Sequence, residues 1–293
     1  MSGIFDTSHV SRAFGRVAAS YDTHAVLQDE VQKRLQERLD DAPLEPRRVV
    51  DIGSGTGRGT AALRKRYPQA QTIALDLALP MLRAAKKHRG WLRPFARVCA
   101  DVEALPFADA SIDLLHSSLC LQWCGNLEAA FDGFRRVMRP QGFLLFSTFG
   151  PQTLHELRSA FADVDAKPHV SRFLDMHQIG DALLAAGFRD PVLARDNFTL
   201  TYVDVLGLMR ELRAIGATNA DSDRSRGLTG KGHLQRVVAA YESFRHEGRL
   251  PATYEVVYAQ AWAPDAGQPR RSGNQDIASF PIDRLRGSRR SRN

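Results

Sequence analysis

The chain has only three cysteines among 293 residues and no apolar run long enough to span a membrane. Cys99, Cys120 and Cys124 form an odd set, and no Cys or His pair downstream completes a metal-ligand spacing. We therefore expect reduced cysteines that serve packing, and no metal site. The opening Met1-Ser2-Gly3 does not begin a signal peptide. These features predict a cytoplasmic protein that does not associate with membranes.

Negative charge is scarce at one end of the chain. The net charge is +7, and residues 265–293 hold seven arginines against three aspartates. This segment is also poor in periodic apolar residues, which predicts a basic disordered tail. A basic tail can contact nucleic acid, but such tails more often serve solubility, so we expect no nucleic-acid partner.

Strand-like and helix-like patterns alternate from residue 47 onward, which indicates an α/β protein with a parallel sheet. The expected strands are 47–52, 71–76, 95–100, 112–117 and 143–149, completed by an antiparallel edge of 192–202 and 253–262; the helices between them are 57–67, 79–88 and 127–138. Helices at 203–215 and 232–245 interrupt that edge. The expected division is an N-terminal capping segment with a helix (1–45), a main domain (46–264) with a helical lid at about 203–250, and the tail (265–293).

The most specific motif follows the first strand. Val49-Val50-Asp51-Ile52 runs into Gly53-Ser54-Gly55-Thr56-Gly57, and Asp76 ends the next strand at the spacing typical of a ribose-binding acid. The dinucleotide fingerprint G-x-G-x-x-G fails in both registers, because Arg58 or Thr60 stands where its third glycine belongs. Asp51 would also repel a pyrophosphate but suits a cationic ligand. A glycine-rich turn without a ligand is the simpler alternative.

G-x-G-x-G after a strand that ends in an acid resembles the class I S-adenosylmethionine (SAM) methyltransferases. That resemblance implies a Rossmann-like, seven-stranded, mostly parallel sheet with SAM as co-substrate. The cofactor site it implies consists of Asp51, Gly53, Gly55, Gly57, Asp76, Leu77, Asp101, Val102 and Ser117. Asp101 would reach the adenine amino group, although a loop acid that caps a turn is the plainer interpretation.

Other candidate residues have structural interpretations. Asp113 is expected to order the start of the fourth strand, and His116 to be a packed imidazole. His177 lies at a helix start and is expected to be exposed. Thr153 with Glu156, and Asp175 with Gln178, have the spacing of capping boxes. The fourth strand lacks the Asn/Asp-Pro-Pro-aromatic motif of enzymes that methylate exocyclic amines, which argues against methylation of nucleic-acid bases.

Several further blocks resemble the malonyl-acyl-carrier-protein O-methyltransferases of biotin synthesis. They are residues 12–22, Leu119 to Trp123, residues 139–157, Leu208 to Asn219 and Thr253 to Tyr258. The resemblance covers nearly everything from Arg12 to Pro264. Gln141 departs from it, since the family has a second glycine in that turn.

The family resemblance implies methyl transfer to the free carboxylate of a malonyl thioester on an acidic acyl carrier protein, by a monomer. Tyr21 would close over the SAM methyl group. Arg158 or Arg210 would hold the substrate carboxylate, although either could be an ordinary helix charge. Gln122 and Trp123 would contact the substrate. A malonyl carboxylate is ionised at neutral pH, so neither a base nor a metal is required.

Two alternatives stay open. Another small-molecule methyltransferase, acting on a free acid or a coenzyme A thioester, would keep the SAM site and change the lid. An RNA-associated module with a SAM fold would act through the basic tail, and its binding would fall steeply with salt.

Overall fold

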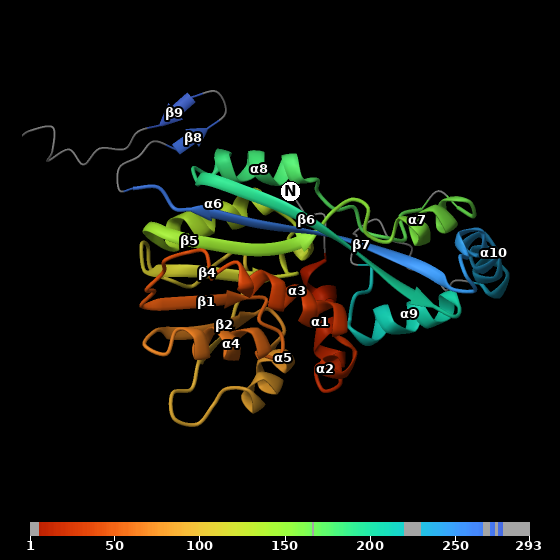
Figure 1. Ribbon diagram of the computed structural model, residues 1–293, viewed down its shortest axis with the longest axis horizontal. Coiled ribbons are helices and arrows are strands. Elements are labelled where there is room, and N and C mark those ends of the chain that lie inside the picture. Colours follow the sequence, from red (N-terminus) through yellow and green to blue (C-terminus); the bar gives the residue numbers. More distant parts are fainter. Residues whose placement is uncertain (1–5, 166, 220–229, 266–269, 273–274, 278–293) are drawn as a thin grey trace, which may run out of the picture.

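Seven strands form one sheet in the order β3-β2-β1-β4-β5-β7-β6 (Figure 1). The computed structural model describes residues 6–165, 167–219, 230–265, 270–272 and 275–277. Strands β1 to β5 pair in parallel, whereas β7 is antiparallel to both β5 and β6. The strands are β1 (Arg48–Ile52), β2 (Gln71–Asp76), β3 (Ala96–Cys99), β4 (Ile112–Ser118), β5 (Met138–Phe149), β6 (Arg189–Tyr202) and β7 (Leu250–Trp262). The predicted fold class is confirmed.

Helices cover both faces of this sheet. Those of the main domain are α4 (Arg58–Arg66), α5 (Leu79–Ala84), α6 (Leu127–Val137) and α8 (Met176–Ala185), and those N-terminal to it are α1 (Thr7–Val17), α2 (Tyr21–His24) and α3 (Val26–Glu37). Three short 3-10 helices, Ala85–Lys87, Leu121–Trp123 and Glu242–Phe244, lie in connections. Helices α3 to α6 agree with the expected helices apart from boundaries, whereas α1 and α2 were not expected, since the sequence predicted one helix in the N-terminal segment.

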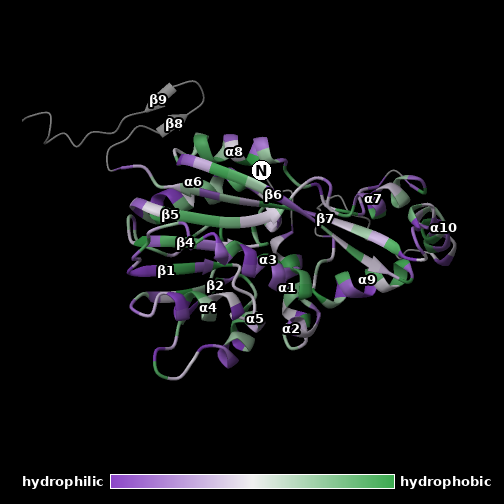
Figure 2. Cartoon of the chain, viewed as in Figure 1, coloured by the Kyte–Doolittle hydropathy of each residue, from purple (hydrophilic) through white to green (hydrophobic). Residues whose placement is uncertain are grey.

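Neighbouring strand residues point to opposite faces and thereby build two cores. Val50 and Leu115 join a cluster with residues of α6 and α8. Val49 and Leu114 join another with residues of α3 and with Leu63 of α4. In Figure 2, β4 and β5 are largely green while the helices around them show both colours. Burial on both faces explains why the central strands read as continuous apolar runs.

The antiparallel edge is longer than the rest of the sheet. Strands β6 and β7 stay paired out to Tyr202 and Leu250, beyond the end of β5 (Figure 1). Their far ends meet α7 (His155–Ala162), α9 (Val205–Ala214) and α10 (Lys231–Tyr241). The two helices predicted between the edge strands are therefore present, and residues 220–229 between them lie outside the described part of the chain.

One local prediction near β5, a turn at residues 139–142 before the strand, is wrong. Residues 139–142 do not form a separate turn: the strand already begins at Met138, and its pairing with β4 shifts register between Ile112 and Leu114. Gln141 adopts a left-handed backbone (φ 62°), the conformation that a glycine adopts without strain. An irregular stretch of strand thus stands where a turn was expected.

One of the two capping boxes is present. The Asp175 side chain accepts a hydrogen bond from the Gln178 backbone N–H, and the Gln178 side chain accepts one from the Asp175 backbone N–H. By contrast, α7 begins after Leu154 without a side-chain cap, since Thr153 donates to the Glu255 carbonyl and Glu156 accepts from Thr253. The pair at 153 and 156 is used in tertiary contacts instead.

The basic tail departs from the prediction in part. Arg270–Ser272 and Gln275–Ile277 pair as two short antiparallel strands, β8 and β9, where no regular structure was expected. Residues 266–269, 273–274 and 278–293 lie outside the described residues. No helix in the described part is both long and apolar enough to cross a bilayer. Cys99 is exposed rather than packed.

Candidate functional site

A cleft of about 780 Å³ opens at the carboxyl ends of the central strands, where ligands bind in open α/β sheets. Its walls come from the glycine loop, the ends of β2 and β4, the loop after β3, and α1. Of the residues predicted for the cofactor site, the cleft is lined by Gly53, Gly55, Asp76, Leu77, Asp101 and Val102.

The glycine loop meets this cleft at two of its three glycines. Gly53 has φ 65°, and a Cβ there would lie 2.4 Å from the Cys120 side chain. Gly55 has φ 52°, and a Cβ there would meet no protein atom within 4 Å. The open side of Gly55 therefore belongs to the cleft, and a ligand can approach the backbone at that point.

Asp76 joins the loop to the end of β2. One carboxylate oxygen accepts from the Gly55 N–H at 2.8 Å, and the other from the Ala78 N–H at 2.7 Å. Burial raises the pKa of Asp76 to about 6, although both hydrogen bonds oppose the shift. The side chain is thus fixed in place at the edge of the cleft.

Three predicted cofactor residues do not line the cleft. Asp51 is buried and accepts from His116 Nδ1 at 2.8 Å and from the Thr60 hydroxyl at 2.6 Å. Gly57 precedes α4, and a Cβ there would strike Ala85 and Phe95. Ser117 is buried and donates to the Ile52 carbonyl, while Ser118 reaches the cleft. His116 is the packed imidazole that was expected.

The loop after β3 supplies the opposite wall. Asp101 caps its own turn by accepting from the Glu103 N–H at 3.0 Å and also lines the cleft. Both interpretations of this residue are therefore compatible with its position. Cys120 lies nearby, and burial raises the pKa of its thiol to about 12, so it stays protonated. Asp113 accepts from the N–H groups of Arg47 and Arg48 and orders that strand start, as expected.

The N-terminal segment covers the mouth of the cleft with aromatic side chains. Phe14 of α1 packs edge-on against Trp123 at 5.5 Å and lies 6.5 Å from Tyr21. Burial, aided by the charge of Asp76, raises the pKa of the Tyr21 hydroxyl. Tyr21 is therefore protonated throughout the neutral range and is not a base.

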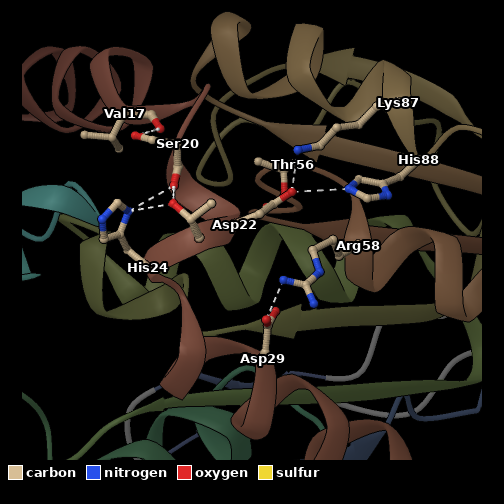
Figure 3. Close-up of polar contacts among 10 residues, drawn as sticks. Val17, Ser20, Asp22, His24, Asp29, Thr56, Arg58, Lys87 and His88 are labelled. Atoms are coloured by element: carbon tan, nitrogen blue, oxygen red, sulfur yellow. Dashed lines mark hydrogen bonds and ion pairs between the residues drawn. The ribbon is translucent and has the colours of Figure 1, made fainter.

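Polar contacts fasten this segment to the main domain (Figure 3). The Asp22 carboxylate accepts from Thr56 of the glycine loop, from Lys87 and from His88. Burial raises the pKa of Asp22, but these three hydrogen bonds outweigh it and hold the pKa below its usual value. Arg58 pairs with Asp29 a little further on. The loop that shapes the cleft and the segment that covers it are thus connected through Asp22.

Replacing Asp22 by Ala should loosen the N-terminal segment. Loss of charge-assisted hydrogen bonds worth about 1–2 kcal/mol predicts roughly tenfold faster amide hydrogen exchange in residues 7–24. Glu37→Gln, at an exposed position of α3, is the control and should leave exchange there unchanged. Equal exchange in wild type and Asp22→Ala would mean that packing alone holds the segment.

A second cavity of about 750 Å³ adjoins the first. Phe14, Tyr21, Leu119 and Trp123 line both, so the two spaces meet at these side chains. Gln122 lines the second cavity and donates to the Leu119 carbonyl at 2.8 Å. Another part of the wall comes from Leu212 of α9 and from His169, Val170, Ser171 and Phe173. The predicted substrate residues Gln122 and Trp123 are thus brought together beside Tyr21.

Neither predicted arginine lines this cavity. The Arg158 guanidinium donates to the Pro151 and Thr153 carbonyls and supports the loop before α7. Arg210 is 74% exposed on α9, beside Asp204. Both arginines therefore have the contacts of ordinary helix charges, and neither belongs to the lining of the second cavity.

A cluster of two histidines and an aspartate borders the second cavity at His169. His169, which lines it, lies 2.9 Å from the Asp165 carboxylate and stacks on Phe161. His233 of α10 lies 3.3 Å from the same carboxylate. Within the described residues these three form a group with the spacing of metal ligands, although their mutual contacts already account for the arrangement. The cluster joins α10 to residues 165–169.

Sequence reasoning expected the N-terminal segment and the inserted helices to cover the ligand site, but it missed most of the residues that line the cavities. Thr7, Val10, Ser11 and Phe14 of α1 line the first cavity, and Gln28, His169, Ser171, Thr218 and Asn219 line the second. Period-2 alternation at the end of β4 indicates that Ser117 and Ser118 face opposite ways. No local pattern identifies the others, because they meet only in the folded chain.

Comparisons with known proteins agree with this geometry. A family model described as a methyltransferase domain matches residues 50–146. The chain is 53% identical to malonyl-acyl-carrier-protein O-methyltransferase of Xylella fastidiosa over 99% of both chains, and 52% identical to the Methylovorus protein of that name over 90% of this chain and 91% of the other. Among solved structures, the YcgJ protein of Bacillus superposes with a TM-score of 0.58 at 16% identity, covering 79% of this chain and 98% of that one.

Proposed function

Because the chain belongs to the malonyl-acyl-carrier-protein O-methyltransferase family, we propose that it transfers the methyl group of SAM to the free carboxylate of malonyl-acyl carrier protein. The product is the malonyl methyl ester, on the way to a pimeloyl thioester and biotin. The observation that supports this best is the pair of adjoining cavities that meet at Tyr21. One has the motif of a SAM site, and the other has room for an acyl group.

In this proposal SAM occupies the first cavity. Asp76 accepts hydrogen bonds from the ribose hydroxyls, and Gly53 and Gly55 lie along the ribose and methionine portion. Leu77, Asp101 and Val102 surround the adenine. Asp51 does not touch SAM, because its carboxylate is hydrogen-bonded to His116 and Thr60. Its negative charge nevertheless lies near the SAM sulfonium and attracts it. Gly57 and Ser117 shape the loop and the strand end without touching SAM.

The chemistry requires positioning and the exclusion of water. A carboxylate oxygen attacks the SAM methyl carbon, the carbon–sulfur bond breaks, and the sulfonium leaves as a neutral thioether. Two opposite charges cancel in this step, so a dry, low-dielectric site favours the transition state over the separated ions. The substrate carboxylate is already ionised, so no side chain has to remove a proton. Tyr21, Phe14 and Trp123 provide the apolar enclosure around the transferred methyl group.

SAM binding should weaken at acidic pH. The pKa of Asp76 lies at about 6, and its protonation removes the charge that strengthens the ribose hydrogen bonds. Affinity should be constant above pH 7 and fall about tenfold by pH 5. The pH dependence of the folding stability of the free protein has the opposite sign. Ionising the buried Asp76 is unfavourable, so its contribution to the free energy of unfolding declines as pH rises from 4 to 6. Calorimetric titration of the protein with SAM at several pH values measures this dependence. An affinity that does not change between pH 5 and pH 7 would mean that Asp76 does not bind the ribose.

The carrier protein is expected to approach the lid. Arg210 and Arg213 on α9, with Lys231 and Arg236 on α10, are exposed, and α9 and its following residues line the second cavity. An acidic carrier protein would be attracted to these charges, and increasing salt would slow its association. We further propose that the enzyme is a cytoplasmic monomer and that residues 203–250 act as a lid over the acyl group.

Transfer of labelled methyl groups from SAM tests this function. Malonyl-acyl carrier protein should accept label and acetyl-acyl carrier protein should not, because the latter lacks the free carboxylate. Malonyl-coenzyme A should react more slowly, most clearly at low salt. If SAM binds but no malonyl thioester is labelled, the SAM site stands and the proposed substrate is wrong.

A further inference from the structure

The malonyl carboxylate of the substrate must be held beside Tyr21 without either of the two arginines that were predicted to bind it. Arg158 is used by backbone carbonyls and Arg210 is exposed. Among its described residues, the lining of the second cavity contains neither arginine nor lysine. His169 is the basic side chain of this lining, and its Nε2 lies 2.9 Å from the Asp165 carboxylate. Apart from His169, the described side-chain donors that line this cavity are therefore neutral.

Neutral donors suit this reaction. The carboxylate has its full charge before methyl transfer and loses charge as the ester forms. A guanidinium paired with it would stabilise the starting carboxylate more than the transition state and would raise the barrier. An amide N–H orients the oxygen at a smaller electrostatic penalty to its reactivity.

The side-chain amide of Gln28, at the second cavity, has no hydrogen-bond partner among the described residues. It lies in the first turn of α3 and lines the second cavity but not the first. Its Oε1 is buried and has no hydrogen-bond partner, and neither amide atom is bonded to another described residue. Buried amides in folded proteins are normally paired, so an unpaired one on a residue that lines a cavity indicates a ligand. Rotation about the last side-chain torsion presents the NH2 group in place of the oxygen.

Gln122 does not fill the same role equally well. Its NH2 group donates to the Leu119 carbonyl, and its oxygen lies 3.4 Å from the Thr148 hydroxyl. Both ends of that amide are engaged, whereas those of Gln28 are unengaged. Resting on the proposed function, we propose that Gln28 is a substrate-binding residue whose side-chain NH2 donates to the malonyl carboxylate and orients it towards the SAM methyl group.

Gln28→Glu tests this inference, because it keeps the shape and replaces the donor with a carboxylate. At pH 8 it should lower kcat/KM for malonyl-acyl carrier protein by at least ~100-fold, since two like charges would meet in one cavity. Near pH 5.5 the new side chain regains a proton in part, and the deficit relative to wild type should narrow several-fold. Gln28→Met, which lacks the donor, should lose roughly 10–100-fold at every pH. SAM affinity should stay within about threefold in both.

Gln178→Glu is the matched control, because a glutamate at that capping-box position still accepts from the Asp175 N–H. It should behave as wild type. Wild-type rates in Gln28→Glu, or a deficit in that variant that does not change with pH, would overturn the inference. If Gln28→Glu does not fold, full activity of Gln28→Met would overturn it and a loss confined to kcat/KM would support it. Failure of the wild type itself to methylate malonyl-acyl carrier protein would instead refute the proposed function.

Discussion

Asp76→Ala should weaken SAM binding by about 150-fold while the protein stays folded. Two hydrogen bonds from ribose hydroxyls to a carboxylate are worth about 1.5 kcal/mol each, and their sum of about 3 kcal/mol corresponds to that factor in Kd. Asp76 also accepts from the N–H groups of Gly55 and Ala78, so its loss loosens the loop as well. Isothermal titration with S-adenosylhomocysteine, which lacks the reactive methyl group, measures the effect without turnover.

Gly133→Ala provides a control for this experiment. Gly133 lies in α6, where an added methyl group would meet nothing within 4 Å, and the change should leave ligand affinity as it is. If Asp76→Ala bound the cofactor as tightly as wild type, the carboxylate at the end of β2 would not face the ribose. The placement of SAM in the first cavity would then have to be abandoned.

Tyr21→Ala should lower kcat about 100-fold, and Tyr21→Phe should stay within about threefold of wild type. The ring of Tyr21 lines both cavities, so its removal admits water to the place where the charges cancel. A factor of 100 corresponds to about 2.7 kcal/mol of transition-state stabilisation. The hydroxyl is expected to matter little, because the raised pKa of Tyr21 keeps it protonated.

Single-turnover rates at saturating SAM distinguish enclosure from cofactor binding for these variants. A comparable loss in Tyr21→Phe would assign the effect to the hydroxyl rather than to the ring. Unchanged rates in Tyr21→Ala would show that the N-terminal segment has no part in the chemical step.

The parts of the fold that depend on local pattern were predictable. Apolar runs such as 47–52 and 112–117 indicate buried parallel strands, and the glycine loop with Asp76 indicates the cofactor cleft from the sequence alone. The errors arise where tertiary contacts override a local rule. Thr153 and Glu156 have capping-box spacing but bond to β7 instead.

The substrate side of the site was less predictable for a physical reason. Its wall combines α3, the loop at 169–173 and the end of α9, which are distant in sequence. Charge suggested that an arginine should meet a carboxylate, but Arg158 satisfies carbonyls near it in the chain. The unpaired amide of Gln28 becomes visible only in the folded chain, where the partners of the neighbouring polar groups are known.

The most direct test of the central claim is the chemical position of the transferred methyl group. Malonyl-acyl carrier protein treated with methyl-labelled SAM should give a product that releases all its label as methanol in mild base, as a methyl ester does. Label that is recovered after base treatment in any form other than methanol would place the methyl group on carbon, nitrogen or sulfur. That result would contradict a carboxyl O-methyltransferase.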